Sequence, residues 1–293
     1  MDDFVGYRAL EVADHELSLT FPMAVLYPTS TPGKVEGVGP YQLDVALGAP
    51  LKEGAFPQVF ISHGTGGSPL AYRTLAHHLA RHGFVVGLPE HPFNNRDGNT
   101  WAGTVRNLTA RPRHLRLAIS ALSGHSTFAA FLQPDAVALI GHSLGGYTAL
   151  ALAGGVPTSF PGEAPDGQPW PIPVAADGRV KALVLLAPAT AWYRADGALR
   201  GVGVPILMLT AEKDEHTLPL HAQVVWNGVP DPAQLEHRTV ENAGHFSFLS
   251  PFPEARNSPA FPPSQDPPGF NRAGFQAELN AGVLAFLART ICI

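Results

Sequence analysis

Residues 136–152 read Ala-Val-Ala-Leu-Ile-Gly-His-Ser-Leu-Gly-Gly-Tyr-Thr-Ala-Leu-Ala-Leu, and this stretch decides the fold. An apolar strand over Ala136–Ile140 passes directly into Gly-x-Ser-x-Gly and then into a helix-forming segment, which is the pattern of a nucleophile elbow. We expect a turn so sharp that a side chain at Gly141 or Gly145 would collide with neighbouring backbone. Ser143 is therefore the candidate nucleophile, held in a strained conformation with its hydroxyl exposed.

Short apolar runs alternate with amphipathic stretches along the rest of the chain. This alternation predicts βαβ units and an α/β fold with a mainly parallel central sheet and helices on both faces. The expected strands are Met23–Tyr27, Gln58–Ser62, Val85–Leu88, Ala136–Ile140, Ala182–Leu186, Ile206–Thr210 and Glu236–Val240. The expected helices are one capped by Ser68 that begins at Pro69 and ends at Gly83, and then Val105–Leu122, Leu144–Leu152, Pro219–Trp226 and Gly274–Arg289.

The size and composition of the chain indicate one compact domain. It has 293 residues, of which 45% are hydrophobic and 15% charged, so a single large core covering 1–293 is expected. Two stretches, 154–178 and 246–270, are rich in Pro, Gly, Ser and aromatic residues and lack apolar periodicity. We interpret both as surface excursions near the carboxyl ends of strands, where α/β sheets hold their sites.

Charge and terminal sequence exclude several classes of function. The net charge of −5 argues against nucleic-acid binding, and the arginines of the Arg106–Arg116 stretch are interpreted as a solvated helix face. The single cysteine, Cys292, excludes a disulfide within the chain. The start at Met1-Asp-Asp lacks a secretory signal and no segment is long enough to span a bilayer, so a cytoplasmic protein is expected, with a removed leader as the open alternative.

A serine nucleophile needs a base and a carboxylate that orients this base. The strand expected at Ile206–Thr210 opens into Ala-Glu-Lys-Asp-Glu-His, and Asp214 lies at the loop position, with Glu212 as the second choice. The last expected strand is followed by Asn-Ala-Gly-His-Phe-Ser-Phe, which makes His245 the candidate base. The chain order of serine, acid and histidine is that of α/β-hydrolases.

A glycine-rich loop after an early strand supplies hydrogen-bond donors. The segment His63-Gly64-Thr65-Gly66-Gly67-Ser68 lies upstream of the elbow, where the loop of an oxyanion hole belongs. The expected donors are the backbone N–H groups of Thr65 and Leu144. A phosphate-binding loop is the alternative, but neither Gly-Lys-Ser/Thr nor the Gly-x-Gly-x-x-Gly spacing is present.

Other histidines and aromatic residues have weaker assignments. His142 is interpreted as a structural residue, and His78 with His82 lacks a third ligand, so no metal is expected. Aromatic side chains from segments near strand ends are candidates for the lining of an apolar acyl pocket. They are Phe93, Trp101, Trp170, Trp192, Phe246 and Phe248.

The motifs Ser-His-Gly-Thr-Gly-Gly-Ser, Gly-His-Ser-Leu-Gly-Gly and Asn-Ala-Gly-His-Phe-Ser-Phe together resemble bacterial dienelactone-hydrolase-like α/β-hydrolases, which are relatives of the platelet-activating-factor acetylhydrolases. This resemblance runs from about Val5 to the last helix. It implies a serine carboxylester hydrolase without metal or organic cofactor, with Ser143 as nucleophile, His245 as base, and Thr65 and Leu144 as oxyanion donors.

The chain departs from this family at two points. True dienelactone hydrolases use a cysteine nucleophile, whereas position 143 is serine. In the acetylhydrolase relatives the acid follows an earlier strand, but here Leu186-Ala187-Pro188-Ala189 has no carboxylate and Asp196 is the first one after that strand. The acid is therefore expected at Asp214.

These observations predict an esterase that acts on small or medium-chain esters through a Ser-His-Asp triad and an acyl-enzyme. A lipase or phospholipase, an amide hydrolase, and a non-catalytic ligand-binding protein of the same fold remain as alternatives. The expected partner is a small-molecule ester, and the sequence does not determine the oligomeric state.

Overall fold

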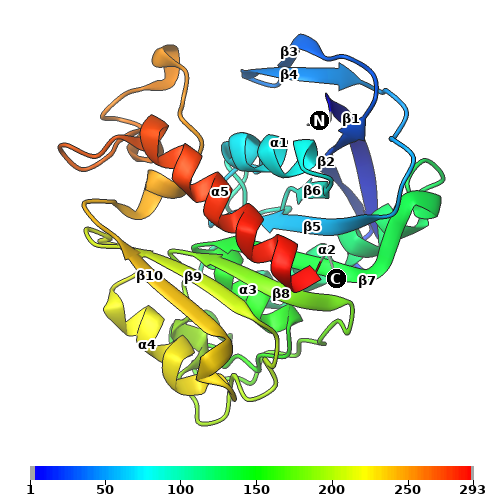
Figure 1. The fold of residues 1–293 in the computed structure, drawn as a ribbon. Coiled ribbons are helices and arrows are strands. Elements are labelled where there is room, and N and C mark those ends of the chain that lie inside the picture. Colours follow the sequence, from blue (N-terminus) through cyan, green and yellow to red (C-terminus); the bar gives the residue numbers. More distant parts are fainter. Residues whose placement is uncertain (1–3, 292–293) are drawn as a thin grey trace.

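The computed structural model describes residues 4–291, which form ten strands and five α-helices around one sheet (Figure 1). The strand order is β10-β9-β8-β7-β5-β6-β2-β1-β4-β3. The strands are β1 (Phe4–Asp14), β2 (Leu19–Thr29), β3 (Lys34–Val38), β4 (Tyr41–Leu47), β5 (Phe56–Ser62), β6 (Val85–Pro89), β7 (Leu132–His142), β8 (Val180–Leu186), β9 (Ile206–Ala211) and β10 (Leu235–Val240). The helices are α1 (Arg73–Arg81), α2 (Val105–Gly124), α3 (Leu144–Leu152), α4 (Pro219–Gly228) and α5 (Arg272–Ile291).

The six strands from β5 to β10 pair in parallel, which confirms the expected mainly parallel sheet. The central strands are apolar along their length because helices cover both of their faces. The chain moves from β5 to β6 on one side and then returns to place β7 on the other side of β5. In open α/β sheets, ligands bind in the crevice at the carboxyl ends of the strands, at the point where the strand order reverses in this way.

Two hydrophobic clusters fill the two faces of the sheet. One cluster contains side chains of α1 and α5, among them Leu79 and Phe286. The other contains side chains of α2, α3 and α4, among them Leu115, Leu150 and Val225. Figure 1 shows α5, in red, crossing the sheet on the same side as α1. Helices therefore cover both faces, as the sequence predicts.

Three strands and one helix boundary differ from the sequence-based expectation. Strands β1, β3 and β4 were not expected, because their apolar residues alternate with charged and polar ones and resemble surface loops. Pro69–Tyr72 forms a 3-10 turn, the α-helix begins only at Arg73, and the Ser68 side chain makes no capping hydrogen bond. The expected cap at Ser68 is therefore wrong.

The two excursions are built mainly of turns and short 3-10 segments. Residues 251–270, which we call the cover segment, run from just after the first 3-10 turn that follows β10 (His245–Phe248) to the start of α5 (orange in Figure 1). Among residues 4–291, no helix has both the length and the apolar character needed to cross a membrane. Cys292 lies outside the described residues.

Candidate active site

The turn between β7 and α3 has the geometry expected of a nucleophile elbow. Ser143 has φ 54° and ψ −121°, in a region that non-glycine residues rarely adopt. A Cβ atom at Gly141 would lie 2.2 Å from the carbonyl oxygen of Gly145, and one at Gly145 would lie 1.9 Å from that of Ser62. Both positions therefore require glycine, as predicted, so that the turn can pack against β5.

Asp214 and His245 form a buried hydrogen-bonded pair. The Nδ1 atom of His245 lies 2.8 Å from Oδ2 of Asp214, and both side chains are at most 6% exposed. Oδ1 of Asp214 accepts from the backbone N–H groups of His216 and Thr217, and Oδ2 also accepts from the Thr217 hydroxyl at 2.7 Å. Burial raises the pKa of Asp214, but the hydrogen bonds and charge of His245 and the Thr217 donors outweigh it and lower the pKa to about 2.

The glycine-rich loop after β5 lies directly beside the elbow. Ser62 pairs with Gly141 across the two parallel strands, and a Cβ atom at Gly64 would lie 3.0 Å from Cβ of Ser143. Within the described chain, the N–H of Thr65 donates to no other backbone oxygen. Leu144 is the first residue of α3, where N–H groups have no partner within the helix. The structure thus places both expected donor residues next to Ser143.

A cavity of about 320 Å³ opens in front of Ser143. Its wall includes Thr65, Ser143 and His245, so three segments that are far apart in sequence meet there. Its other side is formed by Tyr41 of β4 and by Phe252, Arg256, Phe261 and Pro263 of the cover segment. The excursion at 246–270 therefore contributes to the site, whereas none of residues 154–178 lines this cavity.

Only one of the six aromatic residues expected to line the pocket does so, namely Phe246. Phe93 and Trp101 stack on each other with ring centroids 4.3 Å apart, and Trp192 packs against Tyr147 and Phe160. Trp170 is exposed and bonds to Asp166, and Phe248 is buried in the core. The expectation is wrong for these five residues because it rested on their nearness to strand ends, which does not determine the direction of a side chain.

His142 has the structural place expected of it, with hydrogen bonds that the sequence did not reveal. Its Nδ1 atom lies 2.9 Å from the hydroxyl of Tyr72, and its Nε2 atom lies 2.9 Å from the backbone oxygen of His245. Burial, with a smaller effect from His245, lowers the pKa of His142 to about 3. The neutral ring thus fixes the backbone that carries His245.

The arginines of the Arg106–Arg116 stretch do not all face solvent. Arg111 is fully buried beneath the loop of Thr65, and Arg113 pairs with the buried Asp14 at 2.9 Å. The interpretation as a solvated helix face is therefore wrong for both residues. The spacing of arginines along a helix does not show which of its turns are covered by other segments. It also does not show which hydrogen-bond acceptors lie beside each arginine.

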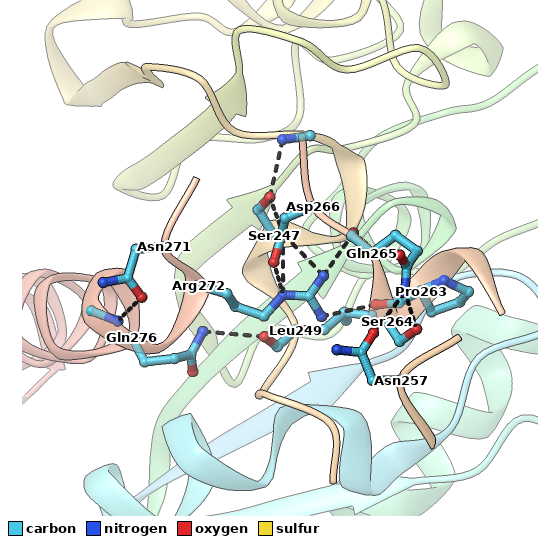
Figure 2. Close-up of polar contacts among 12 residues, drawn as sticks. Ser247, Leu249, Asn257, Pro263, Ser264, Gln265, Asp266, Asn271, Arg272 and Gln276 are labelled. Carbon is cyan, nitrogen blue, oxygen red and sulfur yellow. Dashed lines mark hydrogen bonds and ion pairs between the residues drawn. The ribbon is translucent and has the colours of Figure 1, made fainter. Parts of the chain in front are cut away.

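The cover segment is tied to the loop of His245 by a second polar network (Figure 2). Arg272, the first residue of α5, donates to both carboxylate oxygens of Asp266 at 2.9–3.2 Å, and to the backbone oxygens of Pro263 and Gln265. Asp266 also accepts from the Ser247 hydroxyl at 2.7 Å, whose oxygen accepts from the N–H of Gly244 at 3.0 Å. One carboxylate therefore joins the cavity wall to the residues on either side of His245.

No group of three or more potential metal ligands occurs among residues 4–291. His78 and His82 lie one helical turn apart, with ring centroids 4.3 Å apart, and Nδ1 of His82 lies 2.7 Å from the backbone oxygen of His78.

Comparisons with known proteins support the fold. Residues 37–160 match the model of the chlorophyllase family, a range that contains Thr65 and Ser143 but neither Asp214 nor His245. The structure resembles a ferulic acid esterase from Streptomyces cinnamoneus, with a TM-score of 0.72 and 18% identity over 99% of this chain and 91% of the other. No curated protein sequence matches the chain. The chain thus has the α/β-hydrolase fold, and its match to the chlorophyllase family supports a carboxylic ester hydrolase of the serine type.

Proposed function

We propose that the chain is a serine carboxylester hydrolase that acts through Ser143, His245 and Asp214. The observation that carries this proposal is the buried Asp214–His245 pair, whose histidine lines the same cavity as the strained Ser143. Because Asp214 occupies Nδ1 of His245, the Nε2 atom is left to take the proton of the Ser143 hydroxyl.

The proposed reaction has two steps. The Ser143 oxygen attacks the ester carbonyl as its proton passes to His245, and the tetrahedral oxyanion is stabilised by the N–H groups of Thr65 and Leu144. The alcohol then leaves with the proton held by His245, and an acyl-serine remains. Water attacks this acyl-serine in the same way, which releases the acid and restores Ser143.

The cavity suggests which esters fit. Its volume of about 320 Å³ is at the lower end of ligand pockets, and its lining includes the aromatic side chains of Tyr41, Phe252 and Phe261 beside Arg256. We therefore propose esters with a small or medium acyl group. Because 694 chains of solved structures match the fold, the fold alone does not indicate a substrate.

Mutation of the nucleophile tests the proposal. Ser143→Ala is expected to abolish both the hydrolysis of p-nitrophenyl esters and covalent labelling by a fluorophosphonate, because the hydroxyl forms both bonds. A panel of p-nitrophenyl esters from acetate to palmitate, with a feruloyl ester, a lysophospholipid and an anilide, then defines the substrate class. Labelling of Ser143→Ala at the wild-type rate would refute the nucleophile, and an unlabelled wild type would indicate a non-catalytic protein.

A further inference from the structure

A buried cation lies behind the proposed oxyanion hole. Arg111 of α2 is 0% exposed, and its guanidinium donates to Oδ1 of Asn94 at 2.6 Å, to Oγ1 of Thr148 at 3.0 Å and to the backbone oxygen of His63. A longer contact of 3.3 Å reaches the hydroxyl of Ser62. None of these acceptors is a carboxylate, and within the described chain Arg111 has no ion pair.

Burial of this charge costs the fold free energy that its neutral acceptors offset only in part. Removing a cation from water costs several kcal/mol unless an anion or a full set of acceptors offsets it, and an apolar side chain of similar volume would avoid that cost. Burial lowers the pKa of Arg111 to about 9, so the guanidinium still carries its charge at neutral pH.

The contacts of Arg111 reach both proposed oxyanion donors. On one side Arg111 donates to the backbone oxygen of His63 and to Oδ1 of Asn94. The Nδ2 atom of Asn94 in turn donates to Oγ1 of Thr65 at 2.8 Å. On the other side it holds Thr148, whose hydroxyl donates to the backbone oxygen of Leu144 at 3.0 Å. Both segments that supply a donor N–H are thus fastened to one guanidinium.

The groups around Arg111 leave it as the dominant charge there. Burial, together with the charge of Arg111, lowers the pKa of both His63 and His91, so both rings stay neutral at neutral pH. In a site with low dielectric, a fixed positive charge behind the donors favours the negative charge that develops on the carbonyl oxygen.

We propose that Arg111 is a positioning residue of the oxyanion hole, which it reaches through Asn94 and Thr148. This inference rests on the proposed esterase function. Arg111 then stabilises the transition state more than it stabilises the bound substrate.

Four variants test the inference: Arg111→Met, Arg111→Lys, Asn94→Ala, and Arg113→Met as the control. Arg113 lies on the same helix and pairs with Asp14 and Glu16, away from the oxyanion hole, so Arg113→Met reports the cost of losing a cation from α2. The measurements are kcat and KM for a p-nitrophenyl ester, the inhibition constant of a trifluoromethyl ketone that forms an anionic adduct with serine, and the denaturant midpoint.

We expect Arg111→Met to lower kcat roughly 100-fold with KM changed less than about threefold, because misplacing both donor N–H groups should cost about as much as losing one of them. Asn94→Ala should lower kcat about 10-fold, and Arg111→Lys should recover part of the loss because it restores the charge without the fork of donors. The inhibition constant of the ketone should rise by the same factor as kcat falls, whereas Arg113→Met should keep the kcat of the wild type.

Other outcomes would overturn the inference. Unchanged kcat in Asn94→Ala and Arg111→Met, with only the denaturant midpoint lowered, would make the network structural. Should Arg111→Met fail to fold, Asn94→Ala decides alone, because it leaves Arg111 in place. A wild type that neither hydrolyses esters nor reacts with a fluorophosphonate would instead refute the proposed function, and this inference with it.

Discussion

Two carboxylates follow β9 within three residues, and their surroundings differ. Asp214 is buried and accepts four hydrogen bonds, one of them from His245. Glu212 is exposed and accepts from the N–H of Asn242 at 2.6 Å. Asp196, which follows β8, is also exposed. At the scale of single residues, the acid of the proposed triad is therefore Asp214.

Substitution of these carboxylates tests that assignment. Asp214→Asn is expected to lower kcat by about 10⁴-fold with the fold preserved, because an amide does not hold the imidazole in the tautomer that accepts the serine proton. Glu212→Gln and Asp196→Asn are the controls and should cost less than about threefold. The test is kcat at saturating substrate for all three variants, with circular dichroism to check that each is folded. A large loss of kcat confined to Asp196→Asn would overturn the assignment of Asp214.

The candidates Ser143, Asp214 and His245 were accessible from sequence because each follows a predicted strand, in a fixed order along the chain. The residues that support them were not. Tyr72 and Arg111 reach the site through contacts with segments that are distant along the chain. The chain has thirteen histidines and nineteen lysines and arginines. Which of them become buried depends on how distant segments pack, and the local sequence pattern does not predict it.

At the scale of elements, one ion pair is among the contacts that hold the cover segment to the loop of His245. Arg272 and Asp266 are 6% and 17% exposed, and the Asp266 carboxylate also accepts from Ser247. Without this pair, the carbonyl oxygens of Pro263 and Gln265 would hold the guanidinium alone. The cavity wall and the loop of His245 are therefore expected to loosen together.

Asp266→Asn tests this coupling, with Glu236→Gln in the exposed pair Arg289–Glu236 as the matched control. The first change should lower the free energy of unfolding by about 2–4 kcal/mol, because it leaves a buried cation without its anion. The exposed pair should contribute at most about 1 kcal/mol. Asp266→Asn should also speed proteolytic cleavage within residues 251–270 and slow fluorophosphonate labelling. Equal effects of the two substitutions would contradict a role for Asp266 in holding this segment.

Most of the strands found by sequence are more continuously buried than those missed, and β10, with three of its six residues exposed, is the exception. Strands β5 to β9 are long apolar runs because both of their faces are covered, and these runs were visible in the sequence. Strands β3 and β4 form an antiparallel pair at the edge of the sheet, where one side faces water and charged residues interrupt the pattern. They join the sheet through two paired positions between β4 and β1, and the pattern of a single segment does not predict such a contact.

At the scale of the whole molecule, several histidines are buried in the neutral form. The pKa values of His63, His114 and His142 are lowered to about 3, in each case mainly by burial. For His114, Asp14 favours the charged form while Arg113 and Arg111 oppose it. Both ring nitrogens of His114 lack a hydrogen bond, and the ring packs on Phe21 with centroids 5.1 Å apart.

These pKa values make the fold sensitive to acid. The unfolded chain takes up a proton on each histidine near pH 6.5, whereas the folded chain does not until about pH 3, so the free energy of unfolding falls as the pH drops below about 6.5. Between pH 7.5 and pH 5 each of the three histidines removes about 2 kcal/mol. The sum, about 6 kcal/mol, is comparable with the total stability of an ordinary domain. The lowered pKa of Asp214 adds its own loss only below about pH 4.

Denaturant unfolding between pH 7.5 and pH 5 checks this prediction, with His114→Phe as the test variant and the exposed His15→Gln as its control. His114→Phe removes a titrating ring that makes no hydrogen bond, so its loss of stability on acidification should be about 2 kcal/mol smaller than that of the wild type. His15→Gln should lose as much stability as the wild type over this range, because the His15 side chain is exposed and its replacement leaves the buried rings unchanged. If His114→Phe loses as much stability as the wild type over this range, the acid sensitivity does not arise from this buried ring, and the other neutral histidines beneath the active site must account for it.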